Sequence, residues 1–81
     1  MDIKVIGMGC SECDSFYANV RQAIKNLSLD VEAQKVEDLV EIVKLGVMQS
    51  PALMINGRLV IAGRSANVSE IEKILFRSTS D

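Results

Sequence analysis

The sequence predicts one small α/β domain, with four strands in a single mixed sheet and helices on both faces of that sheet. Three observations predict this fold. Apolar runs typical of strands alternate with segments of helical periodicity along the 81 residues. The dipeptide Asn56-Gly57 separates two of these runs, as in a hairpin, and the expected order is β-α-β-α-β-β-α. A right-handed crossover makes the first two strands parallel, so the first strand is expected at the centre.

The first half of the chain supplies a strand, a helix and a second strand. Ile3 to Ile6 form an apolar run that is ended by glycines. A helix is expected over residues 11–27, because apolar residues recur there at helical spacing. The expected buried face of this helix consists of Phe16, Val20, Ala23, Ile24 and Leu27. Residues 31–36 alternate imperfectly in polarity and are expected to form the second strand.

A short helix is expected over residues 39–45. Asp38 can cap its start, with Glu41 placed as in a capping box, and Gly46 suits its end, where a left-handed residue is favoured. We expect its apolar residues to face the core; these are Leu39, Ile42 and Val43.

The hairpin strands are expected at 52–55 and 58–62. A last helix begins after Asn67, which forms a cap with Glu70, and its buried stripe consists of Val68, Ile71, Ile74 and Leu75. The domain is expected to span residues 1–77, followed by a frayed tail at 78–81.

Composition narrows the class of protein. The chain is 48% hydrophobic with two Phe, one Tyr and no Trp, so the core must be aliphatic, with Met48 and Met54 packed inside it. The net charge is −2 and the nine basic residues are scattered, which argues against a nucleic-acid partner. No apolar run approaches the roughly 20 residues that span a bilayer, and the first residues lack the apolar region of a signal peptide. We therefore expect a cytoplasmic protein with no membrane partner.

The strongest chemical signal is Cys10-Ser11-Glu12-Cys13, which contains the only two cysteines of the chain. Two thiols at this spacing can close a small disulfide ring. At a helix start, unpaired backbone N–H groups and the helix dipole favour the thiolate, which is the reactive form. In the cytoplasm such a pair is more often catalytic, redox-sensing or metal-binding than structural.

Two segments together resemble the thioredoxin-like superfamily, and most closely its small thioredoxin/glutaredoxin-like members of the redox-active disulfide protein 2 type. One segment is Gly9-Cys10-Ser11-Glu12-Cys13 after the first strand, and the other is GVMQSPALMING at residues 46–57. The resemblance implies a thioredoxin fold and a thiol–disulfide oxidoreductase that reduces protein disulfides. It implies that Cys10 attacks the substrate and that Cys13 resolves the mixed disulfide.

The resemblance also implies the surroundings of the cysteines. Pro51 would follow a cis peptide bond, leaving the backbone of Ser50 free to pair with an extended substrate. The chemistry would need no bound metal or organic cofactor. Its partners would be protein disulfide substrates and a thioredoxin-reductase-like electron donor, and nothing in the sequence requires more than a monomer.

The departures from these relatives concern residues that would modulate the thiols. The WCGPC sequence of thioredoxin and the aromatic residue of the glutaredoxin CPYC sequence are absent, and Gly9, Ser11 and Glu12 flank the cysteines instead. Lys4 stands where thioredoxin has a buried carboxylate, and a lysine on a strand more often extends to solvent. Gly63 matches a glycine of glutaredoxin glutathione sites, although a plain turn is the favoured interpretation.

Glu12 supports a hypothesis on redox poise. A carboxylate between the thiols opposes thiolate formation at Cys10, and weaker stabilisation of the reduced thiolate makes the pair a poorer oxidant. We therefore expect a reducing protein. The equally weighted alternative is a solvated charge at a helix start, where the dipole favours it.

Two other functions remain open. Gly7-Met8-x-Cys10-x-x-Cys13 matches the GMxCxxC loop of small copper-carrying domains, in which two thiolates bind Cu(I). Those domains have the order β-α-β-β-α-β, which differs from the order expected here. A zinc site is less favoured, since it would need two chains to share their cysteines.

The other open function is a binding module whose cysteines only sense redox state. An enzyme would turn over with a reductase, whereas a sensor would switch once.

Overall fold

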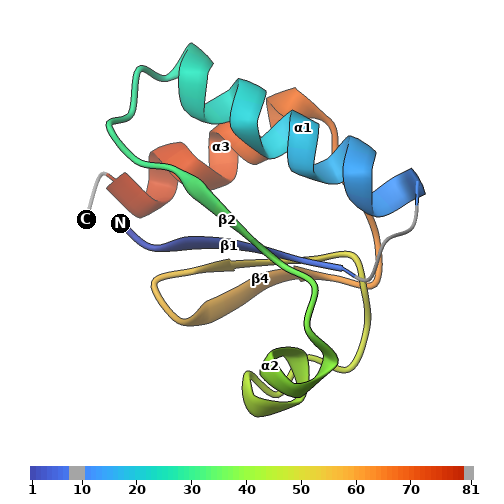
Figure 1. Cartoon of the computed structure of the whole chain (residues 1–81). Coiled ribbons are helices and arrows are strands. Elements are labelled where there is room, and N and C mark those ends of the chain that lie inside the picture. Colours follow the sequence, from blue (N-terminus) through green and yellow to red (C-terminus); the bar gives the residue numbers. More distant parts are fainter. Residues whose placement is uncertain (8–10, 80–81) are drawn as a thin grey trace.

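The computed structural model describes residues 1–7 and 11–79, and it has the predicted order of elements (Figure 1). The strands and helices are β1 (Ile3–Ile6), α1 (Ser11–Asn26), β2 (Ala33–Val36), α2 (Leu39–Lys44), β3 (Ala52–Ile55), β4 (Arg58–Ala62) and α3 (Val68–Thr79). The predicted α/β fold, with one mixed sheet between helices, is confirmed.

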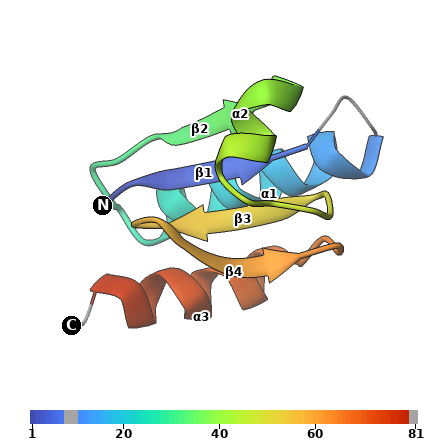
Figure 2. The same ribbon diagram turned by 90° about the horizontal axis from the view of Figure 1, so that it is seen from below.

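The sheet has four strands in the order β2-β1-β3-β4, so β1 is an inner strand as predicted (Figure 2). β1 runs parallel to β2 and antiparallel to β3, and β3 pairs antiparallel with β4. At the end of β1, Ile6 lies opposite Val36 on one side and Ala52 on the other. This register brings the ends of β1 and β2 and the start of β3 to the same edge of the molecule.

Helices α1 and α3 cover one face of the sheet and enclose the main core (Figure 1). This core is built from aliphatic side chains around one aromatic ring, Phe16, which is fully buried. The predicted buried faces of both helices are confirmed, with Leu27, Val68 and Ile74 only partly buried at the margin. In α3, Asn67 Oδ1 accepts a hydrogen bond from Glu70 N at 2.8 Å, which is the predicted cap.

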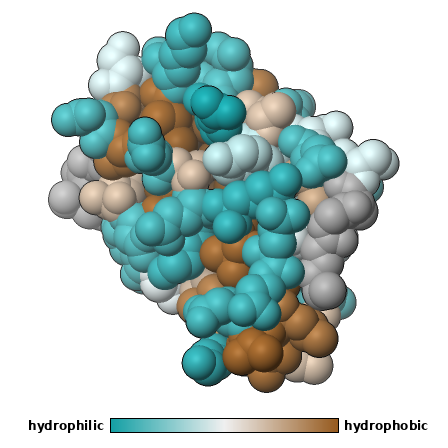
Figure 3. All heavy atoms as spheres, viewed as in Figure 1, coloured by the Kyte–Doolittle hydropathy of each residue, from teal (hydrophilic) through white to brown (hydrophobic). Residues whose placement is uncertain are grey.

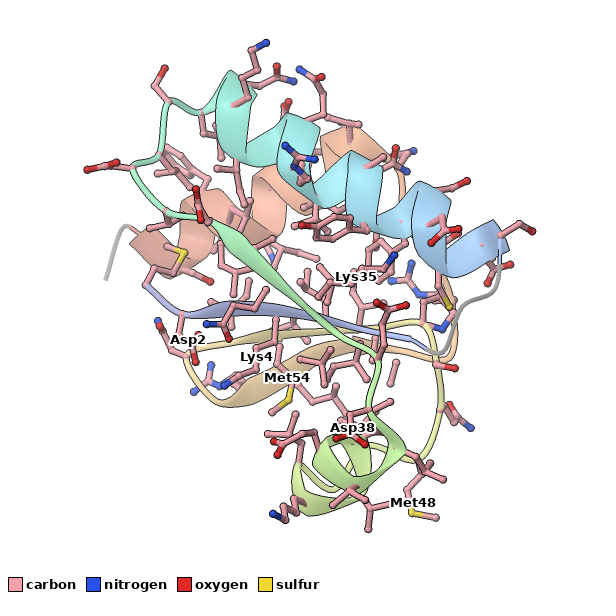
Figure 4. All side chains as sticks on the ribbon, in the orientation of Figure 1. Asp2, Lys4, Lys35, Asp38, Met48 and Met54 are labelled. Carbon is pink, nitrogen blue, oxygen red and sulfur yellow. The ribbon has the colours of Figure 1, made fainter. Side chains whose placement is uncertain are left out.

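Helix α2 covers the other face and packs over a smaller cluster made of Ile6, Ile42, Val47, Ala52 and Met54. Figure 4 shows Met54 pointing from the sheet toward α2. The predicted inward orientation of Leu39 and Val43 is wrong, because these side chains are 56% and 67% exposed. A helix of six residues has fewer than two turns, so only Ile42 is directed onto the sheet.

The expectation that Met48 is buried is also wrong. Its side chain is 93% exposed and lies beyond the end of α2 (Figure 4). Met48 follows Val47, which is buried, and the chain there is in neither helix nor strand. Hydrophobicity alone therefore did not distinguish the two methionines.

Several predicted boundaries differ from those observed. β2 begins at Ala33 rather than residue 31, because its pairing with β1 covers only four residues. α1 ends at Asn26 and α2 at Lys44, each one residue earlier than predicted. α3 continues through Thr79, so Ser78 belongs to the helix and not to a tail, and its Oγ donates to the carbonyl oxygen of Ile74 at 3.1 Å.

The local signals that end and begin α2 are confirmed. Asp38 Oδ1 accepts a hydrogen bond from Val40 N at 3.0 Å, and Gly46 has a φ of 76°. Asn56 and Gly57 also have positive φ, as a tight hairpin requires. Among the described residues, no helix is long and apolar enough to cross a membrane.

The two faces of α3 give a test of the core. Ile71→Ala should lower the free energy of unfolding by about 2–5 kcal/mol, because Ile71 is fully buried between α1 and the sheet. Phe76→Ala changes an exposed residue of the same helix and should stay within about 0.5 kcal/mol. Urea unfolding measures both, and equal losses would contradict the orientation of α3.

Candidate redox site

Cys13 lies in the first turn of α1, close to the end of β1. Its side chain is only 2% exposed, and its sulfur is part of a disulfide bond. The other cysteine of the chain is Cys10, which lies outside the described residues, as does Gly9. The neighbouring Ser11 and Glu12 are exposed at the start of the helix.

Gly7 determines how closely α1 approaches the sheet. Its N–H donates to the carbonyl oxygen of Val36 at 3.0 Å, which continues the pairing of β1 with β2 by one residue. A Cβ atom at this position would lie 2.6 Å from Cys13 Sγ and 2.8 Å from Cys13 Cβ. Only glycine fits here without moving Cys13. From the sequence, Gly7 is expected only as the end of a strand, although a glycine between a strand and a CxxC segment is a signal of close approach.

Ser50 and Pro51 lie on the other side of β1. Because Ile6 pairs with Ala52, the register places Pro51 next to the end of β1, beside Gly7. The Ser50–Pro51 peptide bond is cis, and Pro51 is buried while Ser50 is exposed. The sheet thus brings the segment from 50 to 51 to the same edge as Cys13, although about forty positions separate them in the sequence.

Gly63 joins this edge from the end of β4. Its N–H donates to the carbonyl oxygen of Pro51 at 3.0 Å, and its φ is 78°. A Cβ atom at Gly63 would collide with the side chain of Gln49, two residues before Pro51. The positive φ makes Gly63 a turn glycine, and a side chain there would require the exposed Gln49 side chain to move.

The first turn of α1 is acidic, and one of its carboxylates is held by β2. Lys35 Nζ lies 3.0 Å from Asp14 Oδ1 and 5.4 Å from the centre of the Tyr17 ring (Figure 4). The hydrogen bond to Asp14 raises the pKa of Lys35 above its usual value. Glu12 lies in the same turn, with its side chain exposed.

Lys4 points away from the main core. On β1 it alternates with Ile3 and Val5, which belong to the main core, so it lies on the opposite face. Its ammonium group pairs with Asp2 Oδ2 at 3.0 Å (Figure 4). Lys4 thus extends to solvent beside Asp2 at the start of β1, as the sequence suggested.

Comparisons with known proteins identify the family. A model for the thioredoxin domain matches residues 1–76. This chain belongs to the thioredoxin family. It is 39% identical over 75 residues to a thioredoxin of Methanothermobacter thermautotrophicus, covering 93% of this chain and 97% of the relative. It is 34% identical over 73 residues to a thioredoxin of Methanocaldococcus jannaschii, covering 90% of this chain and 84% of the relative.

Family membership and the order of elements also bear on the copper-carrier alternative. Here α2 precedes the β3–β4 hairpin and the chain ends in a helix, unlike the order β-α-β-β-α-β of those domains. The thioredoxin-like interpretation of the CxxC segment is the one that agrees with the fold.

The contact between Gly7 and Cys13 can be tested by one methyl group. Gly7→Ala should destabilise the oxidised protein by about 1–3 kcal/mol, because the first turn of α1 must move to admit the methyl group. It should also change the reduction potential of the cysteine pair, since the displaced sulfur belongs to the disulfide. Urea unfolding and titration in dithiothreitol buffers measure the two effects.

Gly46→Ala is the control for this substitution. Gly46 also resists replacement because of its positive φ, but a Cβ there meets nothing within 4 Å. Gly46→Ala should lower stability and leave the reduction potential unchanged. A wild-type potential for Gly7→Ala would contradict the proposed constraint on Cys13.

Proposed function

We propose that this protein is a thiol–disulfide oxidoreductase that reduces protein disulfides through Cys10 and Cys13. The observation that carries the proposal is the position of Cys13, which is disulfide-bonded and buried in the first turn of α1. Membership of the thioredoxin family supports it. So does the helix start itself, where unpaired N–H groups stabilise a thiolate.

The reaction has two exchange steps. The Cys10 thiolate attacks one sulfur of the substrate disulfide, forms a mixed disulfide and releases the other substrate sulfur as a thiolate. The Cys13 thiol then loses its proton to water or to the departing thiolate, and its sulfur attacks Cys10. This step releases the second substrate thiolate. The substrate gains two electrons, and the Cys10–Cys13 pair becomes the disulfide.

Burial of Cys13 suits the resolving role. A sulfur that is 2% exposed is shielded from other thiols and disulfides in solution, so its accessible partner is the neighbouring cysteine. The exposed residues Ser11 and Glu12 lie between the two cysteines in sequence, and Gly9 precedes them. In this proposal these three residues modulate the thiols and take no part in bond exchange.

Ser50 and Pro51 would hold the substrate. From Ala52 onward β3 is paired on both sides, with β1 and with β4. The segment before Ala52 is the place where a further extended strand can pair with the backbone near Cys13. The exposed position of Ser50 supports this role.

The proposed partners follow from the reaction. The oxidised pair must be returned to the dithiol by a two-electron donor, and a thioredoxin-reductase-like protein is the class that family membership suggests. The proposed location is the cytoplasm, where lone cysteine pairs are maintained as dithiols. The proposed working form is a monomer, with no nucleic-acid or membrane partner.

A redox titration tests the function. The wild-type pair should show a reversible two-electron transition near the roughly −270 mV of thioredoxin. Cys13→Ser should keep a reactive Cys10 and accumulate a stable mixed disulfide with substrate, whereas Cys10→Ser should form none. Alkylation and mass spectrometry count the thiols. Absence of an intramolecular disulfide, together with protection of both thiols by Cu(I), would favour a copper carrier instead.

Turnover separates an enzyme from a sensor. With a reductant supplied in excess, the wild-type protein should reduce many equivalents of a protein disulfide such as insulin. A single equivalent followed by arrest would indicate a redox-sensing binding module.

The charge of Glu12 gives a prediction about the pKa of the Cys10 thiol. Glu12→Gln should lower the pKa of the Cys10 thiol, because a carboxylate next to a thiolate opposes its formation. Asp14→Asn is a useful control, since Asp14 is already paired with Lys35. Thiolate absorbance against pH measures the change. An unchanged or raised pKa in Glu12→Gln would leave Glu12 as a solvated charge only.

A further inference from the structure

β2 is an outer strand of the sheet, and β1 is its only neighbour among the described strands. Val36 faces β1, because its carbonyl oxygen accepts a hydrogen bond from Gly7 N at 3.0 Å. Backbone groups alternate in direction along a strand, so the N–H and C=O groups of Ala33 and Lys35 point away from β1. Figures 1 and 2 together show that this side of the sheet faces the viewer in Figure 1. An added strand can therefore bond to β2 from that side.

The outer side of β2 lacks the features that usually protect such a strand. At the other side of the sheet, the pairing of β3 with β4 shifts register between Leu53 and Met54, and an irregularity of this kind turns a strand away from further pairing. β2 pairs with β1 in an unbroken register. A lysine on an outer strand also hinders pairing. The ammonium group of Lys35 is instead held at α1, 3.0 Å from Asp14 Oδ1.

A hollow of about 360 Å³ lies between α1 and the chain that enters β2. It is lined by Tyr17, Arg21, Ile24, Val31, Glu32 and Ala33. Tyr17, Val31 and Ala33 are only partly buried. The Tyr17 hydroxyl donates to Ala33 O at 3.4 Å, and a carbonyl oxygen has a second lone pair for another donor. In Figure 3, which looks onto this side, hydrophobic atoms lie between hydrophilic ones at the upper left, where the chain passes from α1 to β2.

Arg21 defines one of the side chains that the hollow accepts. Its guanidinium carbon lies 5.7 Å from the centre of the Tyr17 ring, and it forms no ion pair with any residue of 1–7 or 11–79. Glu32, the other charged lining residue, is likewise in no ion pair within these ranges. A carboxylate that approaches Arg21 can therefore form a charge-assisted hydrogen bond without breaking an existing ion pair.

The geometry of an antiparallel strand fixes which of its residues meet the hollow. One residue would lie opposite Ala33 and exchange both backbone hydrogen bonds with it. Ala33 packs against the main core, and paired side chains share a face, so this side chain enters the hollow. α1 runs in the direction opposite to β2, which places Arg21 one turn beyond Tyr17, toward Val31 (Figure 1). The side chain two residues later in the added strand therefore reaches Arg21.

Charge argues against a second copy of this chain as the added strand. In the antiparallel registers that use the outward groups of both copies, Lys35 of the second copy lies opposite Val31, Ala33 or Lys35 of the first. The first two registers bring an ammonium group to the hollow that holds Arg21. The last sets two lysines directly against each other, and like charges in that position destabilise a pair of strands. The strand that fits belongs to a different protein.

We propose that the outer side of β2 binds an extended segment of a partner protein as an added antiparallel strand, and that it selects the pattern apolar–x–acidic. The apolar side chain occupies the hollow opposite Ala33, and the acidic side chain pairs with Arg21. The Ser50–Pro51 segment precedes β3, on the other side of β1. The inference therefore does not rest on the proposed oxidoreductase function.

Peptide binding to the oxidised ¹⁵N-labelled protein tests the proposal without any thiol exchange. The probe is acetyl-Ser-Thr-Thr-Leu-Thr-Glu-Thr-Ser-amide, and amide shifts should concentrate at residues 17–24 and 31–36. Replacing the leucine of the probe by serine should weaken binding about tenfold, because the contact of one leucine side chain with the hollow is lost. Replacing its glutamate by glutamine should weaken binding about threefold, and less when salt is added.

Methylation of the probe backbone tests the strand pairing itself. N-methylation of the leucine removes the N–H group that faces Ala33 and should abolish binding. N-methylation of the threonine after it changes an N–H group that points to solvent, and it should leave binding unchanged. Equal binding by the two methylated probes would overturn the proposal, since side chains alone would then account for the affinity.

Variants of the protein locate the acidic contact. Arg21→Gln should remove the difference in affinity between the glutamate and glutamine probes. Two exposed residues serve as controls and should keep at least the wild-type difference: Glu32→Gln, in the same hollow, and Arg58→Gln, on the other outer strand. Absence of binding would overturn the proposal. Shifts confined to residues 50–52 would also overturn it, because the probe would then occupy the proposed substrate segment.

Discussion

The structure depends on the pairing of β1 with a strand on each side. At its end, Ile6 lies between Val36 and Ala52, and the next residue continues the pairing when Gly7 N donates to Val36 O at 3.0 Å. Because both neighbours are fixed at this one position, the chain leaving β1 and the chain entering β3 meet at the same edge. Strand register brings Cys13 and the Ser50–Pro51 bond together.

The same edge explains why glycine occurs where it does. Close packing of α1 on the end of β1 leaves no room for a Cβ at Gly7, and the turn after β4 leaves none at Gly63 beside Gln49. Gly7 allows Cys13 to pack against the end of β1, and Gly63 leaves space for the side chain of Gln49, which precedes Pro51 by two residues. A small domain has few buried residues with which to hold such a site. Here the strongly packed β3, buried along its whole length, supplies much of that support.

The order of elements, the sheet topology and the main core could be predicted from sequence because their signals are local and repeated. Helical spacing identified the inner faces of α1 and α3, and the cap at Asn67 located the start of α3. The cysteines were evident from their spacing. What could not be predicted depends on distant parts of the chain: the start of β2 is limited by the start of β1, and the close contact at Gly7 appears only when α1 is docked. The orientation of α2 was missed because six residues are too few to define a periodicity.

The exposed side of α2 is the part of the fold that stability does not explain. Its inner side has Ile42 against Met54 and Val47, and its start is capped by Asp38. These contacts suffice to place a short helix whose own propensity is marginal. The aliphatic side chains that point outward from α2 bury little in the folded protein and contribute little to it. Polar residues at those positions would serve the fold as well, so the apolar surface beside Ser50 requires an explanation outside the domain. The register of β1 places that surface and Cys13 on adjoining sides of the same proline.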